Sequence, residues 1–206
     1  MKIPYLTQTP LTNDIPAKFD TYGIPFEKVC CVNWDTFPYC PEAKVRLAYT
    51  ESHLLVHYSV DEQSVRAQFE NDGGDVWTDS CMEIFIATGN GDNYINIECN
   101  CIGTLLVAQG EGRQNRTRLP KEQVDSIKRW ASLGRKSFPQ REEPTHWEVA
   151  LAIPLEIIGQ PKESLTFNVY KCGDALPTPH FLSLFPIHTA EPDFHQPRFF
   201  QKVALE

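Results

Sequence analysis

The sequence predicts an all-β domain, a two-sheet antiparallel β-sandwich of the immunoglobulin or jelly-roll type with one short helix. Apolar and polar residues alternate with a period of two in about nine segments, which is the pattern of half-buried strands. Clusters of Gly, Asn, Asp and Pro separate these segments, as expected for turns. Only one segment has helical spacing, whereas a parallel α/β fold needs a helix between most pairs of strands.

The length and the charge narrow the class of protein. The chain of 206 residues is within the range of a single large all-β domain, and 41% hydrophobic with 22% charged residues is typical of a globular chain. The formal net charge is -8. Because clustered Lys and Arg bind phosphates, we expect no nucleic-acid partner and no membrane partner. The sequence does not indicate the oligomeric state.

The N-terminus and the cysteines bear on the compartment. The N-terminal sequence MKIPYLTQ lacks the apolar core of a secretory signal, and no segment approaches the roughly 20 apolar residues of a membrane helix. The seven cysteines are an odd number, which is typical of free buried thiols in a reducing compartment. We therefore expect a cytoplasmic protein if Met1 is the native start, and an extracytoplasmic one if a signal has been removed.

Residues 1–41 are predicted to be an irregular segment that wraps the surface of the same domain. Six prolines in this segment interrupt the hydrogen bonding of both helices and strands. The sandwich itself is expected to span residues 42–206. Its first two strands, at 44–49 and 54–60, alternate strictly and are joined by a short turn at 50–52.

The middle of the chain contains a polar loop and three more strands. Residues 61–80 are rich in Gly and Asp and lack alternation, which predicts a loop. Strand patterns follow at 81–87, 94–101 and 103–108. The sequence GNGDN at 89–93 is a strong turn signal between the first two of these strands.

The single helix is predicted at 120–133. Pro120 suits the first helical position, and Glu122 suits the positively charged first turn. Apolar residues then recur on one face of this segment. The remaining strands are predicted at 145–153, 165–171, 181–184 and 199–205.

Strand alternation also predicts which polar side chains share a face. In three strands, at 81–87, 94–101 and 165–171, the apolar residues point to the core and a polar column points to the outer face of one sheet. Carboxylates, amides and a tyrosine make up this column, and such groups can bond the neighbouring hydroxyls of a sugar. The column consists of Glu83, Asn96, Glu98, Asn100, Asn168 and Tyr170.

Aromatic side chains near this column complete the predicted sugar site, because the apolar face of a pyranose stacks on an aromatic ring. Trp77 lies at the end of the polar loop, just before the strand of Glu83, and is the first candidate. Phe194, in the late loop at 192–195, is the second.

Residues 77–85 (WTDSCMEIF) resemble the signature of the family 9 carbohydrate-binding modules. The resemblance covers about residues 30–206. The chain is most similar to a free-standing bacterial subgroup, the carbohydrate-binding family 9-like domains. Other segments that resemble the family or the subgroup lie at 43–49, 54–58, 147–154, 167–170, 170–174 and 192–195.

The resemblance implies a non-catalytic domain that binds a mono- or oligosaccharide between two aromatic side chains. It places the first aromatic residue at Trp77, the second near Phe194 and an acidic ligand at Glu83. Glu98 stands where the family has an arginine. The subgroup's motifs add three candidate ligands: Asn100, Lys171 and His195.

Family members also hold structural calcium, and no other cofactor is implied. Calcium is bound by oxygen ligands, which three aspartates near the polar loop could supply. These candidate metal ligands are Asp61, Asp75 and Asp79.

Other functions stay open. Glu83 and Glu98 could serve a glycoside hydrolase as acid and nucleophile or base, although the chain lacks the G-x-S-x-G and H-E-x-x-H motifs. A protein-interaction sandwich that has lost sugar binding is the second alternative, because Glu98 and Phe194 depart from the family pattern. The two carboxylates could also select a cation or an amino sugar.

Overall fold

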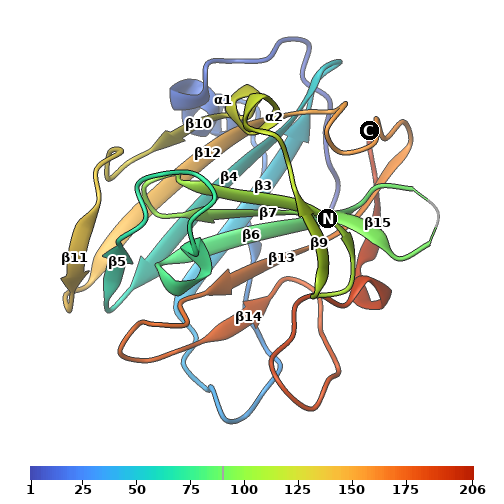
Figure 1. Cartoon of the computed structure of the whole chain (residues 1–206). Helices are drawn as coiled ribbons and strands as arrows, with labels where there is room; N and C mark the ends of the chain where they lie inside the picture. The colour runs from blue at the N-terminus through green and yellow to red at the C-terminus, as the bar shows by residue number, and fades with distance from the viewer. Residues whose placement is uncertain (90) are drawn as a thin grey trace.

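The computed structural model describes residues 1–89 and 91–206 (Figure 1). Its helical segments are η1 (Thr12–Asp14), α1 (Ile15–Thr21), η2 (Val76–Thr78), α2 (Lys121–Ser126) and η3 (Pro197–Phe199). Its strands are β1 (Glu27–Lys28), β2 (Cys31–Val32), β3 (Glu42–Tyr49), β4 (His53–Glu62), β5 (Val65–Ala67), β6 (Cys81–Ala87), β7 (Asn93–Asn100), β8 (Leu105–Glu111), β9 (Asn115–Arg118), β10 (Lys128–Ala131), β11 (Phe138–Arg141), β12 (Thr145–Pro154), β13 (Ser164–Cys172), β14 (Phe181–Ser183) and β15 (Gln201–Ala204).

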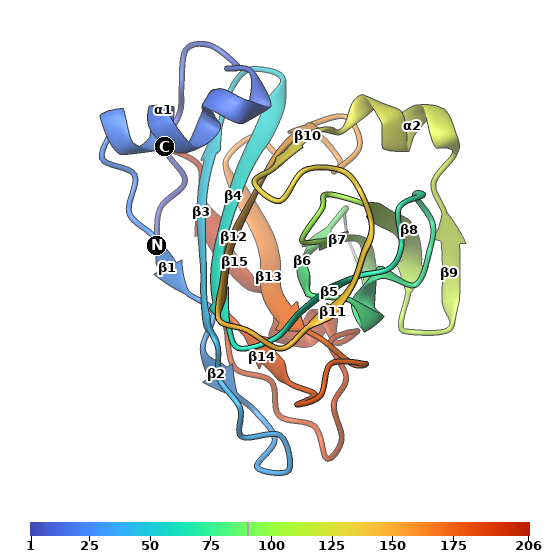
Figure 2. The same cartoon turned by 90° about the vertical axis from the view of Figure 1, so that its left-hand side faces the viewer.

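Two antiparallel sheets form the body of the molecule and pack face to face (Figure 2). The smaller sheet has five strands in the order β1-β3-β4-β12-β10. The larger has eight, in the order β2-β14-β13-β6-β7-β8-β9, with β15 paired to the first half of β13. Strands β5 and β11 form a separate pair. The predicted antiparallel β-sandwich is therefore confirmed.

The predicted strands agree with the structure where alternation is long. β6 has the predicted bounds, and β7 and β13 differ from the prediction by one residue at each end. The predicted turn at 89–93 includes Asn90, which lies outside the described residues. The strands that the sequence does not reveal are two to four residues long, too short to show a period of two: β1, β2, β5, β9, β10 and β11.

The main hydrophobic core fills the space between the two sheets. Alternate residues of β6 and β7, such as Ile84 and Ile97, are fully buried there against Val56 and Tyr58 of β4. Burying such a side chain contributes roughly 1.5–3 kcal/mol relative to leaving it exposed. The inward residues predicted from alternation in these strands all belong to this core.

The predicted helix at 120–133 is only half right. α2 ends at Ser126, and Lys128–Ala131 form β10, which pairs with the edge of β12. The backbone bonds offered by that edge outweigh the helical spacing of the segment, since helix propensity is a weak prior. No helix among the described residues is both long enough and apolar enough to cross a lipid bilayer.

The N-terminal segment contains more regular structure than its prolines suggest. α1 begins with Pro16 in its first turn, a position that proline favours. Ile15 and Phe19 of this helix are buried against Ala48 and Leu55, on the outer face of the five-stranded sheet. The segment therefore covers a sheet face, although residues 1–41 are not irregular throughout.

The outer face of the eight-stranded sheet is also partly covered. Phe85, Tyr94 and Tyr170 form a second hydrophobic cluster on this face with Trp34 and Phe194 from loops outside the sheet. The polar column predicted for this face therefore lies among apolar side chains and under loops. Such a setting leaves room for a pocket where the loops do not meet the sheet.

Lys171 does not belong to this face. Phe167 and Val169, four and two positions earlier in β13, point into the main core. Lys171 faces the same side of the strand and has no exposed surface. Its ammonium group lies 2.9 Å from Glu62 Oε2 and donates to Nε2 of His180 at 2.8 Å. The prediction of Lys171 as a sugar ligand is therefore wrong, and its role is to pair a buried carboxylate.

We expect Lys171→Met to lower the free energy of unfolding by about 3–5 kcal/mol, because it leaves the Glu62 carboxylate buried without a counter-charge. Adding Glu62→Gln, which keeps an acceptor for the indole N–H of Trp147, should restore part of this loss. Urea unfolding of the two single variants and the double variant measures the coupling. Additive losses in the double variant would show that the pair does not interact as described.

Candidate functional site

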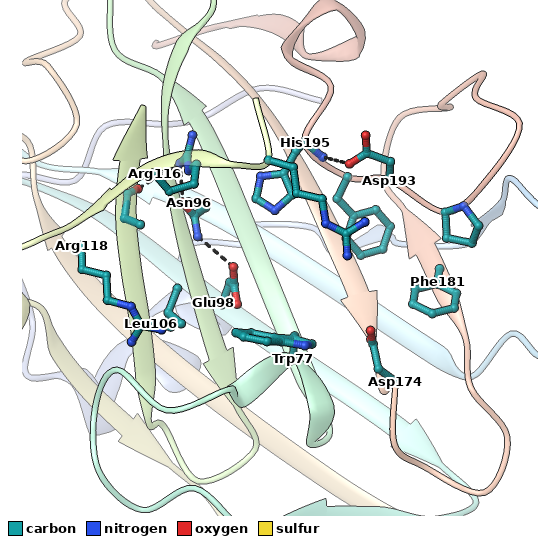
Figure 3. Close-up of a pocket in the computed structure, with 14 residues that line it drawn as sticks. Trp77, Asn96, Glu98, Leu106, Arg116, Arg118, Asp174, Phe181, Asp193 and His195 are labelled. Atoms are coloured by element: carbon teal, nitrogen blue, oxygen red, sulfur yellow. Dashed lines mark hydrogen bonds between the residues drawn. The ribbon is translucent and has the colours of Figure 1, made fainter. Parts of the chain in front are cut away.

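A pocket of about 330 Å³ opens on the outer face of the eight-stranded sheet (Figure 3). This volume lies at the lower end of the range for small-ligand pockets. Its floor comes from β7 and β8, and its walls come from η2, the β8–β9 hairpin and two late loops. The lining residues are Trp77, Asn96, Glu98, Leu106, Ala108, Arg113, Arg116, Arg118, Asp174, Phe181, Pro192, Asp193, Phe194 and His195.

Trp77 forms one wall of the pocket and is partly exposed. It lies in the short helix η2, whose Val76 is fully buried in the second hydrophobic cluster. The carbonyl oxygen of Trp77 accepts a hydrogen bond from the backbone N–H of Asp174 at 3.2 Å. An apolar anchor on one side and a backbone bond on the other fix this indole at the pocket.

Asp79 fixes the loop that carries Trp77. Its carboxylate is fully buried and accepts hydrogen bonds from the backbone N–H groups of Gln68 and Phe69, at 2.9 and 3.1 Å, and from Arg66 Nε at 3.3 Å. With these donors around it, the carboxylate has no free oxygen to offer a metal. The prediction of Asp79 as a calcium ligand is therefore not supported by its geometry.

Asn100, a predicted sugar ligand, belongs to the same structural network. Its amide donates to Asp79 Oδ2 at 3.0 Å and to the carbonyl of Phe69 at 2.9 Å. Its oxygen accepts from the N–H of Thr104 at 2.9 Å. Asn100 is fully buried and does not line the pocket, so it holds the loop instead of facing a ligand.

The two other predicted aspartates do not join Asp79. Asp61 is half-exposed and lies 3.0 Å from His146 Nδ1, while Asp75 is exposed and precedes η2. In the described part of the chain, the group of three potential ligands that lies close enough together for one ion is Cys81, Glu83 and Cys172, all buried. The predicted cluster of aspartates is absent from that part.

Glu98 and Asn96 form the polar floor of the pocket, as Figure 3 shows. Asn96 Nδ2 donates to Glu98 Oε1 at 2.8 Å, and Asn96 Oδ1 accepts from Arg116. Arg116 also donates to three backbone carbonyls and packs over the ring of Tyr94. The chain of bonds therefore positions Glu98 and leaves its second oxygen, Oε2, without a partner among the described residues.

Burial raises the pKa of Glu98 to about 7, and the amide of Asn96 and the charge of Arg116 oppose this shift. The desolvated carboxylate is the less favoured form. Near neutral pH the group therefore exists in both forms. Its unpartnered oxygen can accept a hydrogen bond when ionised, and the protonated group can donate one.

Glu83 does not reach the pocket, although it is the cross-strand partner of Glu98. It is 3% exposed, and its Oε1 accepts from the thiol of Cys172 at 3.0 Å. Burial, and then the proximity of Glu98, hold the pKa of Glu83 well above its usual range. The prediction of Glu83 as a ligand residue is therefore not supported, because neighbouring residues of the same chain cover it.

Tyr170 and Asn168 share the predicted face but support other residues. The ring of Tyr170 stacks on Phe194 with the centroids 4.2 Å apart, and its hydroxyl donates to the carbonyl of Phe194 at 3.1 Å. Asn168 bonds both the N–H and the carbonyl of Phe185 at 3.0 Å. Both side chains are fully buried and neither lines the pocket, whereas Phe194 does.

His195 lines the pocket with a defined tautomer. Tyr94 donates its single hydroxyl proton to the carbonyl of Gly112 at 2.8 Å, so in its 2.6 Å bond with His195 the donor is Nδ1–H. Nε2 is then an acceptor. Burial, and then the charge of Arg116, lower the pKa of His195 to about 4, so the ring is neutral near pH 7.

Sequence reasoning missed the arginines of the β8–β9 hairpin. Arg113, Arg116 and Arg118 all line the pocket, and none forms an ion pair with a carboxylate within the described residues. β9 has no apolar alternation, so the sequence does not predict a strand for this segment. A signal was nevertheless present, since three arginines within six residues are unusual in a chain with a net charge of -8. Asp174 and Phe181 were missed as well.

Comparison with known proteins identifies relatives of this chain. A family model described as carbohydrate-binding family 9 matches residues 13–205. The crystal structure of a "putative carbohydrate-binding protein" from Bacteroides uniformis is 38% identical with a TM-score of 0.95, and the match covers 100% of this chain and 98% of that chain. No curated protein matches the sequence.

More distant structures share the fold. A family 9 carbohydrate-binding module from Caldicellulosiruptor kristjanssonii in complex with glucose has a TM-score of 0.65 at 11% identity, covering 100% of this chain and 96% of that one. A complex with cellotriose from the same organism has a TM-score of 0.54 at 10% identity, with 100% and 94% covered.

We expect Glu98→Gln to stabilise the protein increasingly as the pH rises from about 4 to about 7. The unfolded carboxyl titrates near pH 4.3, below the folded one, so wild-type stability falls across this window as the proton is lost, by on the order of a few kcal/mol. Urea unfolding from pH 4 to 8 measures the difference. The exposed Glu122→Gln is the control, and a pH-independent difference for Glu98→Gln would contradict the raised pKa.

Proposed function

Because the chain belongs to carbohydrate-binding family 9, we propose that the pocket beside Trp77 binds a mono- or oligosaccharide without transforming it. One observation carries this proposal. A partly exposed indole stands over a floor whose Glu98 carboxyl is buried yet leaves Oε2 without a partner. An unsatisfied buried oxygen beside an aromatic face is the pairing that a sugar hydroxyl and a pyranose ring would complete.

Trp77 supplies the apolar part of the proposed site. The C–H face of a pyranose is apolar, and an indole offers it a large flat surface. η2, the backbone bond from Asp174 and the network of Asp79 hold this indole in place before a ligand arrives. Such preorganisation favours binding because little side-chain freedom is lost.

A second wall of the proposed site is aromatic as well. Phe194 and Phe181 line the pocket with their ring centroids 6.2 Å apart. Tyr170 covers one face of Phe194, so this residue presents its other surface and edge to the pocket. This wall offers a smaller surface than a second tryptophan, and we assign the main stacking interaction to Trp77.

The polar groups of the pocket would bond the hydroxyls of the sugar. Glu98 contributes Oε2, His195 contributes the acceptor Nε2, and Asp174 places a carboxylate at the pocket. Carboxylates accept strong hydrogen bonds from hydroxyl groups. A few such groups in an otherwise apolar pocket are typical of small-ligand sites.

A binding role fits the acids better than hydrolysis does. A glycosidase requires two carboxyl groups that flank the scissile bond, and the predicted pair of Glu83 and Glu98 does not meet this requirement, because Glu83 lies outside the pocket with its Oε1 bonded to the Cys172 thiol. The carbohydrate-binding family is one of non-catalytic modules. Release of the aryl group from a panel of aryl glycosides, lost in Glu98→Gln, would contradict a purely binding role.

We expect Trp77→Ala to weaken sugar binding by at least about tenfold, because the stacking surface is lost. Isothermal titration calorimetry with glucose, cellobiose, xylobiose, galacturonate and glucosamine measures it. Trp130→Ala is the matched control, since this indole packs on the outer face of the other sheet and should leave binding unchanged. Circular dichroism verifies that both variants keep the fold.

Three results would contradict the proposed site or the proposed function. Wild-type binding that survives in Trp77→Ala would place the sugar elsewhere. Loss of the folded state in this variant alone would show that Trp77 is a core residue. Absence of heat with every sugar would favour a protein-interaction domain over a sugar-binding one.

A further inference from the structure

Positive charge is concentrated at the pocket in an acidic protein. Lys and Arg number 19 in the whole chain, against 27 Asp and Glu, yet three arginines lie between residues 113 and 118 and all line this one pocket. The β8–β9 hairpin brings them there. Unpaired guanidinium groups at a pocket attract anions, because their field extends about a Debye length, about 10 Å at 0.1 M salt.

Arg116 has a structural task. It donates to the carbonyls of Gly110, Tyr94 and Ala108 and to Asn96, and it lies over the ring of Tyr94 at 4.0 Å from the centroid. Its charge contributes to the field of the pocket. Its terminal nitrogens Nη1 and Nη2 are bonded to these protein atoms, and its Nε is buried without a partner among the described residues, so we do not assign the recognition of a ligand to Arg116.

Arg113 and Arg118 retain free donors. Both are exposed, and Arg118 donates to the carbonyl of Gly73 through Nη1 only, while Arg113 has no hydrogen-bond partner within the described residues. Each charge acts on the pocket: Arg118 favours the ionised form of Glu98, and Arg113 disfavours protonation of His195. A guanidinium with free N–H groups binds a carboxylate, sulfate or phosphate in a bidentate manner.

The acids of the pocket do not neutralise these two arginines by contact. Asp193 accepts from the N–H of His195 at 3.0 Å and from the side chain of Gln196 at 2.5 Å, which turns it toward its own loop. Asp174 lies on the opposite side of Trp77 from Arg118, as Figure 3 shows. Burial raises the pKa of Asp174 to about 6 and the charge of Arg113 opposes this shift, but the two side chains form no ion pair within the described residues. Glu98 is held by Asn96 and is partly protonated near pH 7.

We propose that this pocket selects an anionic saccharide, a sugar that carries a carboxylate, sulfate or phosphate group, and that Arg113 and Arg118 recognise the anionic group. This inference rests on the proposed function, since the sugar ring is taken to lie against Trp77. It reverses the selectivity that the paired carboxylates Glu83 and Glu98 suggest from sequence. One of them is covered, and the other, Glu98, shares the pocket with three arginines and two aspartates, of which Asp193 is bonded within its own loop.

Matched pairs of neutral and acidic sugars test the proposal by calorimetry. The pairs are glucose with glucuronate, galactose with galacturonate, and glucose with its 6-sulfate and its 6-phosphate. We expect at least one acidic member to bind about tenfold more tightly than its neutral partner at low salt. This ratio should shrink between 50 and about 500 mM NaCl, because salt screens charge. The uronate, sulfate and phosphate arms distinguish the kind of anion.

Substitutions identify the groups that recognise the anion. Arg113→Gln and Arg118→Gln, alone and together, should lower the ratio of acidic to neutral affinity, with the double variant near a ratio of one. Arg113→Lys should keep part of the ratio, because it keeps the charge. Arg141→Gln removes an exposed arginine of β11, outside the pocket, and should leave the ratio unchanged.

The outcomes separate this proposal from the one on which it rests. Equal or tighter binding of the neutral partners would overturn anionic selectivity and leave sugar binding intact. A preference for acidic sugars that persists in the double Gln variant would overturn the role of Arg113 and Arg118. A lack of binding by every sugar, neutral and acidic, would overturn both proposals.

Discussion

The pocket depends on one buried carboxylate, that of Asp79. It accepts hydrogen bonds from the loop before η2, from Arg66 and from Asn100 on β7, and so it ties the segment that carries Trp77 to the sheet. Loop tips are ordinarily the mobile part of a domain. Here the carboxylate of Asp79 obtains its backbone hydrogen bonds only when the loop is in place. The position of the loop therefore depends on the hydrogen bonds that this buried group requires. The indole is therefore presented on a rigid frame.

Some residues of the polar column hold neighbouring parts of the structure in place, and others line the pocket. Asn100, Asn168 and Tyr170 satisfy backbone groups or brace a neighbouring ring, and Glu83 is covered. Asn96 and Glu98 remain at the surface of the pocket. A buried polar group without a partner costs free energy, so the unpartnered oxygen of Glu98 indicates a position where a ligand group would restore a lost hydrogen bond.

Alternation in the sequence was sufficient for the sandwich and for the shared face of Asn96 and Glu98, because a period of two is set by local geometry. Alternation also places Lys171 on the core-facing side of its strand, with Phe167 and Val169. The prediction of Lys171 as a sugar ligand followed the family motif instead and was therefore wrong. The role of Asp79 could not be read from sequence, because its partners at residues 66–69 meet it only in the folded chain. The arginines of the β8–β9 hairpin were not predicted as site residues, because β9 has no apolar alternation that would identify it as a strand.

The central claim is that the indole of Trp77 and the carboxyl of Glu98 face the same ligand. A crystal structure of the protein soaked with a mixture of glucose, glucuronate and galacturonate tests it most directly. The account predicts a sugar ring stacked on Trp77 with a hydroxyl within hydrogen-bonding distance of Glu98 Oε2, and an acidic group beside Arg113 or Arg118. A sugar bound on another face of the sandwich, with this pocket filled only by solvent, would contradict it.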